Sequence, residues 1–130
     1  MNIPEGFAQV TPYIFADEAD AYVEFIIAAF GAVELGRSLG PEGRIANCQL
    51  RIGTATIMVS EASADFPAGS TAFYLYVQDA ALAMQRALDA GAVKIMDVAN
   101  MTYGDRQGGV RDPGDNIWWL SQRLSEEAYF

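Results

Sequence analysis

The chain carries the same pattern twice, and this repeat constrains the fold more than any other feature. Residues 13–34 read YIFADEADAYVEFIIAAFGAVE, and residues 74–94 read YLYVQDAALAMQRALDAGAVK. Each copy has an apolar strand, an acidic turn, a helix with one apolar face, and Gly-Ala-Val at the start of another strand. A repeat of this size predicts two supersecondary modules that build one core.

The flanking residues extend both copies to the order β-α-β-β-β. Alternating β-branched and aromatic residues indicate strands, apolar residues three and four apart indicate helices, and glycines mark their ends. The predicted strands are 10–16, 33–38, 45–52, 55–60, 72–77, 93–98, 106–111 and 117–122, and the predicted helices are 19–30 and 79–90. We therefore predict an α+β fold in a single domain, 1–130. Module one lies at about 8–61, a small and polar linker at 62–71, and module two at about 72–124.

Strand parity divides the side chains of the two equivalent strands between two faces. Ile14 and Ala16, like Leu75 and Val77, are expected to pack on the helices. A soluble sheet rarely leaves an aromatic face exposed to water, so the opposite face is expected to curl into a cup or to meet another subunit. Four aromatic side chains lie on that opposite face, namely Tyr13, Phe15, Tyr74 and Tyr76.

Composition excludes several classes of function. Hydrophobic residues make up 52% of the chain and the net charge is −9, which suits a folded core and disfavours a nucleic-acid partner. The chain has no histidine, which excludes Ser-His-Asp and Cys-His catalysis. Its acidity would attract a cationic ligand, although net charge more often serves solubility.

The single cysteine, Cys48, lies in the apolar stretch IANCQLRI and cannot form an internal disulfide. It is predicted to be a small buried hydrophobe, and its being alone favours a reducing cytoplasm. The first residues lack the pattern of a signal peptide, and no apolar run is long enough for a membrane span. We therefore expect a cytoplasmic protein without a membrane partner.

Four stretches resemble one known superfamily. They are 4–34, 43–53, LYVQD at 75–79, and YGDR at 103–106 followed by Asp112-Pro113. Together they resemble the vicinal oxygen chelate superfamily of glyoxalase I, extradiol dioxygenases and bleomycin-resistance proteins, and within it the PhnB-like branch. The resemblance implies two βαβββ modules that form a cupped mixed sheet with the helices on its outer face. It also implies a homodimer, because related small members build each cup from two chains.

The resemblance further implies a divalent metal held by the first and last strands of each module. The corresponding positions are Thr11, Glu61, Ala72 and Trp119. Only Glu61 among them has a carboxylate. With threonine, alanine and tryptophan at the other three positions, the set cannot supply the three or four donors that zinc, nickel or iron needs. We therefore predict a site without metal or other cofactor, which argues against glyoxalase and dioxygenase chemistry.

The candidate ligand-binding residues are aromatic or polar positions of the cup. A tryptophan at a former ligand position suits stacking on a flat compound, and the simpler reading is that it fills space. The tyrosines and Phe15 are either a pocket wall or ordinary core, and the polar residues are either ligand contacts or solvated strand positions. The full set is Trp119, Tyr13, Phe15, Tyr74, Tyr76, Asn47, Gln49, Thr11 and Glu61, where Asn47 and Gln49 stand for His and Glu of the PhnB-like pattern.

Three functions remain open at this stage, and no catalytic residue is assigned. The first is a protein that binds or sequesters an aromatic or cationic small molecule, as bleomycin-resistance proteins do. The second is an enzyme of the same superfamily, metal-free or with an atypical ion, that uses Glu61 or Asp105 as a base. The third is a degenerate structural or regulatory dimer. Asp105 and Arg106 are expected to form a structural turn and ion pair, and Glu61 a solvated strand end.

Overall fold

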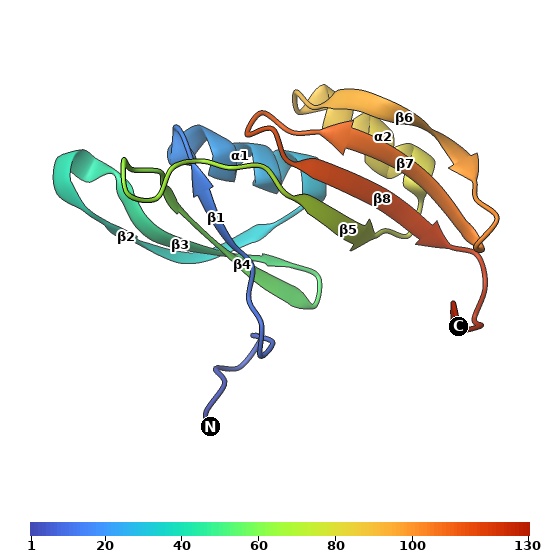
Figure 1. Cartoon of the computed structure of the whole chain (residues 1–130), viewed down its shortest axis with the longest axis horizontal. Helices are drawn as coiled ribbons and strands as arrows, with labels where there is room; N and C mark the ends of the chain where they lie inside the picture. The colour runs from blue at the N-terminus through green and yellow to red at the C-terminus, as the bar shows by residue number, and fades with distance from the viewer. The chain divides into compact units, whose positions relative to one another are not determined.

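The computed structural model describes all residues, 1–130, and the chain divides into two compact units. Unit one is Met1–Gly69 and unit two is Ser70–Phe130, so the boundary falls within the predicted linker. Each unit is one βαβββ module with a four-stranded mixed sheet and one helix (Figure 1). The predicted α+β class and the two modules are confirmed.

Unit one has the strand order β1-β4-β3-β2, with β1 parallel to β4 and the other neighbours antiparallel. Its elements are β1 (Tyr13–Ala16), α1 (Ala19–Phe30), β2 (Val33–Leu39), the short 3₁₀ turn η1 (Pro41–Gly43), β3 (Ile45–Ile52) and β4 (Ala55–Glu61). The first strand begins three residues later than predicted. Pro12 has no N–H to offer a ladder, and Val10 is exposed.

Unit two repeats this topology with the order β5-β8-β7-β6, and β5 is parallel to β8. Its elements are β5 (Ala72–Tyr76), α2 (Ala80–Asp89), β6 (Val93–Asn100), β7 (Asp105–Arg111) and β8 (Ile117–Arg123). The bounds of the helices and strands agree with the predicted ranges to within three residues. Neither α1 nor α2 is long and apolar enough to cross a membrane.

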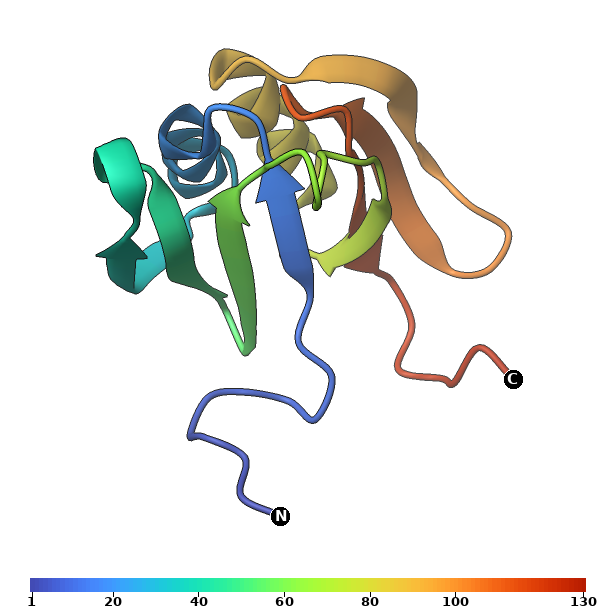
Figure 2. The ribbon, with the colours of Figure 1, turned by 60° about the vertical axis from the view of Figure 1, so that its left-hand side comes forward.

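In each unit the helix lies across one face of its own sheet (Figure 2). Ile14 and Ala16 are buried on that face, as strand parity predicts, and Cys48 and Leu50 join them. Burial raises the pKa of the Cys48 thiol to about 11, so this residue packs as a small hydrophobe and is a poor nucleophile. The core of unit one is therefore the layer between α1 and its sheet.

The core of unit two depends on a close approach of helix and sheet. A Cβ at Gly108 of β7 would lie 2.7 Å from Cε of Met84 on α2 and 2.8 Å from Cγ2 of Val98. Trp118 is buried on the same side and contacts Phe73, with ring centroids 4.5 Å apart. The side of each sheet that meets its helix is thus filled by packing. We call the opposite side of each sheet the helix-free face, and a binding site is expected there.

Candidate functional site

The helix-free face of unit two carries most of the chain's unusual chemistry. Strand register sets its members, because directly paired residues of neighbouring strands point to the same side. Trp119 pairs with Tyr74 on β5 and with Gly109 on β7. The residues of this face that bear on the site are Tyr74, Tyr76, Asp105, Gln107, Gly109, Trp119, Ser121 and Arg123.

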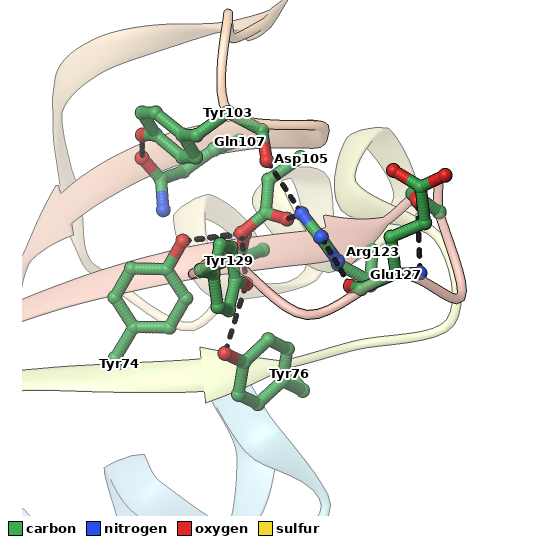
Figure 3. A network of polar contacts seen from close by, with 10 residues as sticks. Tyr74, Tyr76, Tyr103, Asp105, Gln107, Arg123, Glu127 and Tyr129 are labelled. Carbon is green, nitrogen blue, oxygen red and sulfur yellow. Dashed lines mark hydrogen bonds and ion pairs between the residues drawn. The ribbon is translucent and has the colours of Figure 1, made fainter.

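The centre of this face is Asp105, whose side chain is fully buried. Its Oδ2 accepts a short hydrogen bond from the Tyr74 hydroxyl and further bonds from Ser121 Oγ and the Tyr129 hydroxyl, both at 2.7 Å (Figure 3). Its Oδ1 accepts from Nη1 of Arg123 at 2.9 Å. We call these five residues the aspartate–tyrosine cluster. A buried charge is tolerated here because every carboxylate oxygen is paired.

The cluster fixes the protonation of its members. Burial alone would raise the pKa of Asp105, but the hydrogen bonds from Tyr74, Arg123, Ser121 and Tyr129 outweigh it and hold the pKa well below its usual range. Burial and the bond to Asp105 raise the pKa of Tyr74. At neutral pH the cluster therefore holds one carboxylate among neutral phenols, and such a carboxylate is a weak base.

Tyr129 reaches the cluster from the segment 124–130, which follows β8 and has no regular secondary structure. Its hydroxyl also shares a hydrogen bond of 2.9 Å with the hydroxyl of Tyr76, and its ring lies under Arg123, 4.0 Å from the guanidinium carbon. Arg123 in turn donates to the carbonyl of Glu127 at 2.7 Å. The phenol of Tyr129 therefore occupies part of the helix-free face (Figure 3).

Two further residues give this face a ring surface and a free donor. A Cβ at Gly109 would lie 2.5 Å from Cζ3 of Trp119, so the indole rests directly on the glycine. Gln107 is 4% exposed, and its Oε1 accepts a short hydrogen bond from Tyr103. Its Nε2 is buried without a hydrogen-bond partner, an arrangement that costs about 1–3 kcal/mol.

The predicted residues of unit two, Tyr74, Tyr76 and Trp119, lie together on this face. The predicted ion pair between Asp105 and Arg106 is wrong. Asp105 pairs with Arg123, while Nη1 of Arg106 donates to Asn100 at 3.2 Å. The reason is strand geometry, since consecutive residues of β7 point to opposite faces.

The predicted residues of unit one gather on the helix-free face of their own sheet. Nδ2 of Asn47 donates to the Tyr13 hydroxyl at 3.4 Å, and Nε2 of Gln49 donates to Oδ1 of Asn47 at 3.2 Å. Phe15 lies between two rings, at centroid distances of 5.1 Å from Tyr13 and 5.5 Å from Phe66. Thr11 lies outside the strand, where its hydroxyl donates to the carbonyl of Ala8 at 3.4 Å.

Glu61 has a different task from those considered in the sequence. Its two carboxylate oxygens accept hydrogen bonds of 3.0 Å from the backbone N–H groups of Glu18 and Ala19, at the start of α1. It is therefore a helix cap rather than a solvated strand end, and its oxygens are engaged where a base would need them free. Gln122 does the same for α2, with Oε1 accepting from the N–H of Ala80 at 3.1 Å.

The positions that the resemblance assigns to metal ligands are Thr11, Glu61, Ala72 and Trp119, and the Thr11 hydroxyl already donates to the carbonyl of Ala8. Ala72 has no donor atom, Trp119 offers only an indole N–H, and Glu61 is engaged as a cap. No group of three or more His, Cys, Asp or Glu side chains lies together anywhere in the chain.

Sequence reasoning considered Tyr74 and Asp105 and left out the other three residues of the aspartate–tyrosine cluster, Ser121, Arg123 and Tyr129. Parity along β7 and β8 would have placed Asp105, Ser121 and Arg123 on the face of Trp119, because they lie two or four residues from positions already on it. Nothing in the sequence pattern indicates Tyr129, because a segment without regular secondary structure has no periodicity from which to infer where a side chain points.

Comparison with known proteins agrees with the fold. No protein-family model matches the chain. An uncharacterized protein of Mycobacterium bovis is 33% identical over 128 residues, which cover 90% of this chain and 84% of that protein. The X-ray structure of an Arabidopsis thaliana gene product is 27% identical, with a TM-score of 0.70 over 88% of this chain and 98% of that chain.

Two other solved structures share the fold at lower identity. TnmS3, an antibiotic binding protein from Streptomyces sp. CB03234, has a TM-score of 0.71 at 19% identity and covers 95% of this chain and 98% of its own. A member of the glyoxalase/bleomycin resistance protein/dioxygenase superfamily from Sphaerobacter thermophilus has a TM-score of 0.69 at 19% identity, over 89% and 98% of the two chains. With the repeated βαβββ modules, these findings show that the chain has the fold of the glyoxalase/bleomycin resistance protein/dioxygenase superfamily.

Proposed function

We propose that this chain binds an aromatic small molecule without a metal, on the helix-free face of unit two. The observation that carries the proposal is the juxtaposition on one face of a half-buried indole, a buried carboxylate hub and an amide donor without a partner. Apolar ring surface with a few fixed polar groups is the usual composition of a small-molecule site. The likeness to an antibiotic binding protein and to bleomycin-resistance proteins supports the same class of function.

Trp119 supplies the stacking surface in this proposal. Its ring lies close over Gly109, which leaves the indole half-exposed for a planar ligand to stack on. Nε2 of Gln107 supplies a hydrogen bond to a ligand acceptor, which would recover the cost of its burial. The rings around Phe15 in unit one form a second, less polar aromatic surface.

Binding is better supported than catalysis. The two carboxylates considered as bases are Glu61 and Asp105, and both already accept hydrogen bonds at each oxygen. The donors around Asp105 also hold its pKa low, which opposes proton abstraction. Sequestration needs neither a base nor a metal.

A ligand panel tests the proposal directly. Quinoline (neutral), proflavine (cationic) and 8-anilinonaphthalene-1-sulfonate (anionic) would be titrated by calorimetry into the intact protein. We expect at least one to bind, and Trp119→Leu to weaken it about tenfold, the effect of losing one ring contact and its buried area. Phe130→Ala is the matched control, because this ring is fully exposed, and its affinity should equal that of the wild type. Indifference to all three compounds would favour the structural or regulatory alternative.

Two further expectations accompany the proposal. Metal analysis of protein purified without chelator should give no stoichiometric transition metal, and a stoichiometric ion would return an enzyme of the superfamily to first place. Exposed aromatic side chains such as Tyr13, Tyr74 and Tyr76 favour a homodimer, as the family resemblance does. Size-exclusion chromatography with light scattering would test this, and a strict monomer would contradict it.

A further inference from the structure

The segment 124–130 places one of the protein's own phenols on the proposed binding face. Tyr129 makes three contacts there: its hydroxyl donates to Asp105 at 2.7 Å, it shares a 2.9 Å bond with Tyr76, and its ring lies 4.0 Å from the Arg123 guanidinium carbon. The sheet thus offers an acceptor, a second hydroxyl and a cation over the ring. Those are the groups that recognise a neutral phenol.

The segment that delivers Tyr129 is held weakly. Every residue of 124–130 except Ser125 is exposed, and Tyr129 itself is 42% exposed. Apart from those of Tyr129, its hydrogen bonds to the rest of the unit are from the N–H of Leu124 to the carbonyl of Gly104 at 2.9 Å and from Arg123 to the carbonyl of Glu127 at 2.7 Å. A segment with so few buried contacts opens at low free-energy cost.

The cluster keeps its other partners when Tyr129 leaves. Asp105 still accepts from Tyr74, Ser121 and Arg123, all of which belong to strands of the sheet. The carboxylate is then one donor short, and Arg123 and Tyr76 each lose a partner. A diffusible molecule with a hydroxyl on an aromatic ring could make the same three contacts, to Asp105, Tyr76 and Arg123.

We propose that Tyr129 is an intramolecular stand-in for the ligand, and that the ligand class of this face is the neutral phenol. This inference rests on the proposed small-molecule function and adds its chemical class and an autoinhibitory contact. The ionised Asp105 repels phenolates and carboxylates, so the hydroxyl must carry its proton. Because only the open state binds, the apparent dissociation constant is the intrinsic one divided by the open fraction.

p-Cresol is the appropriate probe, since it is the side chain of tyrosine as a free molecule, and toluene is the same ring without the hydroxyl. Binding would be followed by two-dimensional NMR of the intact protein, through the side-chain signals of Arg123 and Gln107. We expect Tyr129→Ala to bind p-cresol about tenfold more tightly than the wild type, the effect of removing one charge-assisted hydrogen bond that competes. Toluene should gain no affinity, and Phe130→Ala should match the wild type.

Tyr129→Phe keeps the ring under Arg123 and removes only the hydroxyl, so it should give an intermediate gain for p-cresol. It also serves if the alanine variant fails to fold. Equal p-cresol affinity in the wild type and in both Tyr129 variants would overturn the inference, and so would an equal gain for toluene. If the non-phenolic panel still binds, only the inference is lost, whereas failure of every compound removes the proposed function itself.

Discussion

The helix-free face of unit one is organised by ring contacts, whereas the equivalent face of unit two is organised around a buried charge. Strand register makes the comparison residue by residue, since Tyr13 pairs with Met58 as Tyr74 pairs with Trp119. Gln49 of β3 and Gly109 of β7 hold equivalent positions, and counting back from them sets Ile45 at the start of β3, beyond a register shift, against Asp105 at the start of β7. One module therefore carries a buried isoleucine where its copy carries a buried carboxylate.

This difference explains how the neighbouring positions have diverged. Phe15 in unit one corresponds to Tyr76 in unit two, and a hydroxyl is useful only where there is a network to join. Irregular segments also meet both faces in different ways. The Gly6 carbonyl accepts from Thr56 at 2.6 Å in unit one, while a tyrosine side chain enters the cluster in unit two. The repeat thus preserves the backbone plan and leaves the face free to change chemistry.

The largest effect is expected from removing the charge of Asp105 in unit two. Asp105→Asn leaves the donors of the cluster with a weaker acceptor and places an amide N–H against one of them. We expect a loss of about 3 kcal/mol in the free energy of unfolding, the usual cost of breaking a buried, hydrogen-bonded charge. Both tryptophans lie in unit two, so urea unfolding followed by tryptophan fluorescence reports on this unit.

Asp97→Asn is the matched control for that experiment. Asp97 lies in the same unit, and its side chain is 82% exposed in a surface pair with Lys94. Its unfolding midpoint should equal that of the wild type. An Asp105→Asn midpoint that also equals the wild type would mean that the carboxylate does not organise the face.

The same charge predicts a pH dependence of the wild-type protein. The folded-state pKa of Asp105 is lowered, so its stabilisation is fully present above the ordinary aspartate pKa of about 3.9 and is lost as pH falls below it. The pKa of Tyr74 is raised, so its contribution is present below the ordinary tyrosine pKa of about 10 and is lost as pH rises above it. Asp105→Asn should flatten the acid side of the stability curve, which urea midpoints at several pH values would measure. An unchanged acid side would show that other carboxylates dominate.

Much of this architecture could be predicted from the sequence, because it depends on local periodicity. Alternation along the first strand of each module placed Ile14 and Leu75 toward the helices, and apolar spacing placed both helices. The same alternation put Tyr74 and Tyr76 on one face. These inferences require only the neighbours of a residue along the chain.

The cluster itself could not be predicted in this way, because its partners are set by contacts distant in the sequence. Asp105 meets Arg123 only through the antiparallel register of β7 and β8, and the adjacent Arg106 looked the nearer partner in the sequence. Tyr129 lies in a segment without regular secondary structure, where propensity does not indicate the direction of a side chain. Glu61 was misread for a related reason, since capping from a neighbouring strand leaves no local signature.

A smaller loss of stability is expected from adding a side chain at Gly109, whose counterpart in unit one is Gln49. Gly109→Ala places a Cβ 2.5 Å from Trp119 and forces the indole off the sheet. We expect a loss of about 2 kcal/mol, typical of overpacking, together with a shift of the tryptophan emission. Gly36→Ala is the control, because nothing lies within 4 Å of its added Cβ, and it should leave stability unchanged or slightly raised. An unshifted emission in Gly109→Ala would mean that the indole does not need the glycine.

The smallest predicted effect concerns how each unit starts its helix. The N-cap of α1, Glu18, has a left-handed backbone and no side-chain cap, so Glu61 alone serves the N–H groups of Glu18 and Ala19. The N-cap of α2, Asp79, accepts from the N–H of Leu82 at 3.0 Å, and Gln122 adds only one bond. Glu61→Ala should therefore cost about 1–2 kcal/mol and Gln122→Ala about 0.5 kcal/mol.

Circular dichroism at 222 nm during urea unfolding would measure both helix-cap variants, since it follows both helices. Glu61→Gln keeps an acceptor and removes the charge that opposes the helix dipole, so its midpoint should fall between those of the wild type and Glu61→Ala. Removing the second cap of α2 in an Asp79→Ala, Gln122→Ala double variant should bring its cost close to that of Glu61→Ala. Equal losses in the free energy of unfolding for Glu61→Ala and Gln122→Ala would contradict the expectation that α1 depends more on its cap than α2 does. They would show that each strand end contributes alike, whatever cap the helix carries itself.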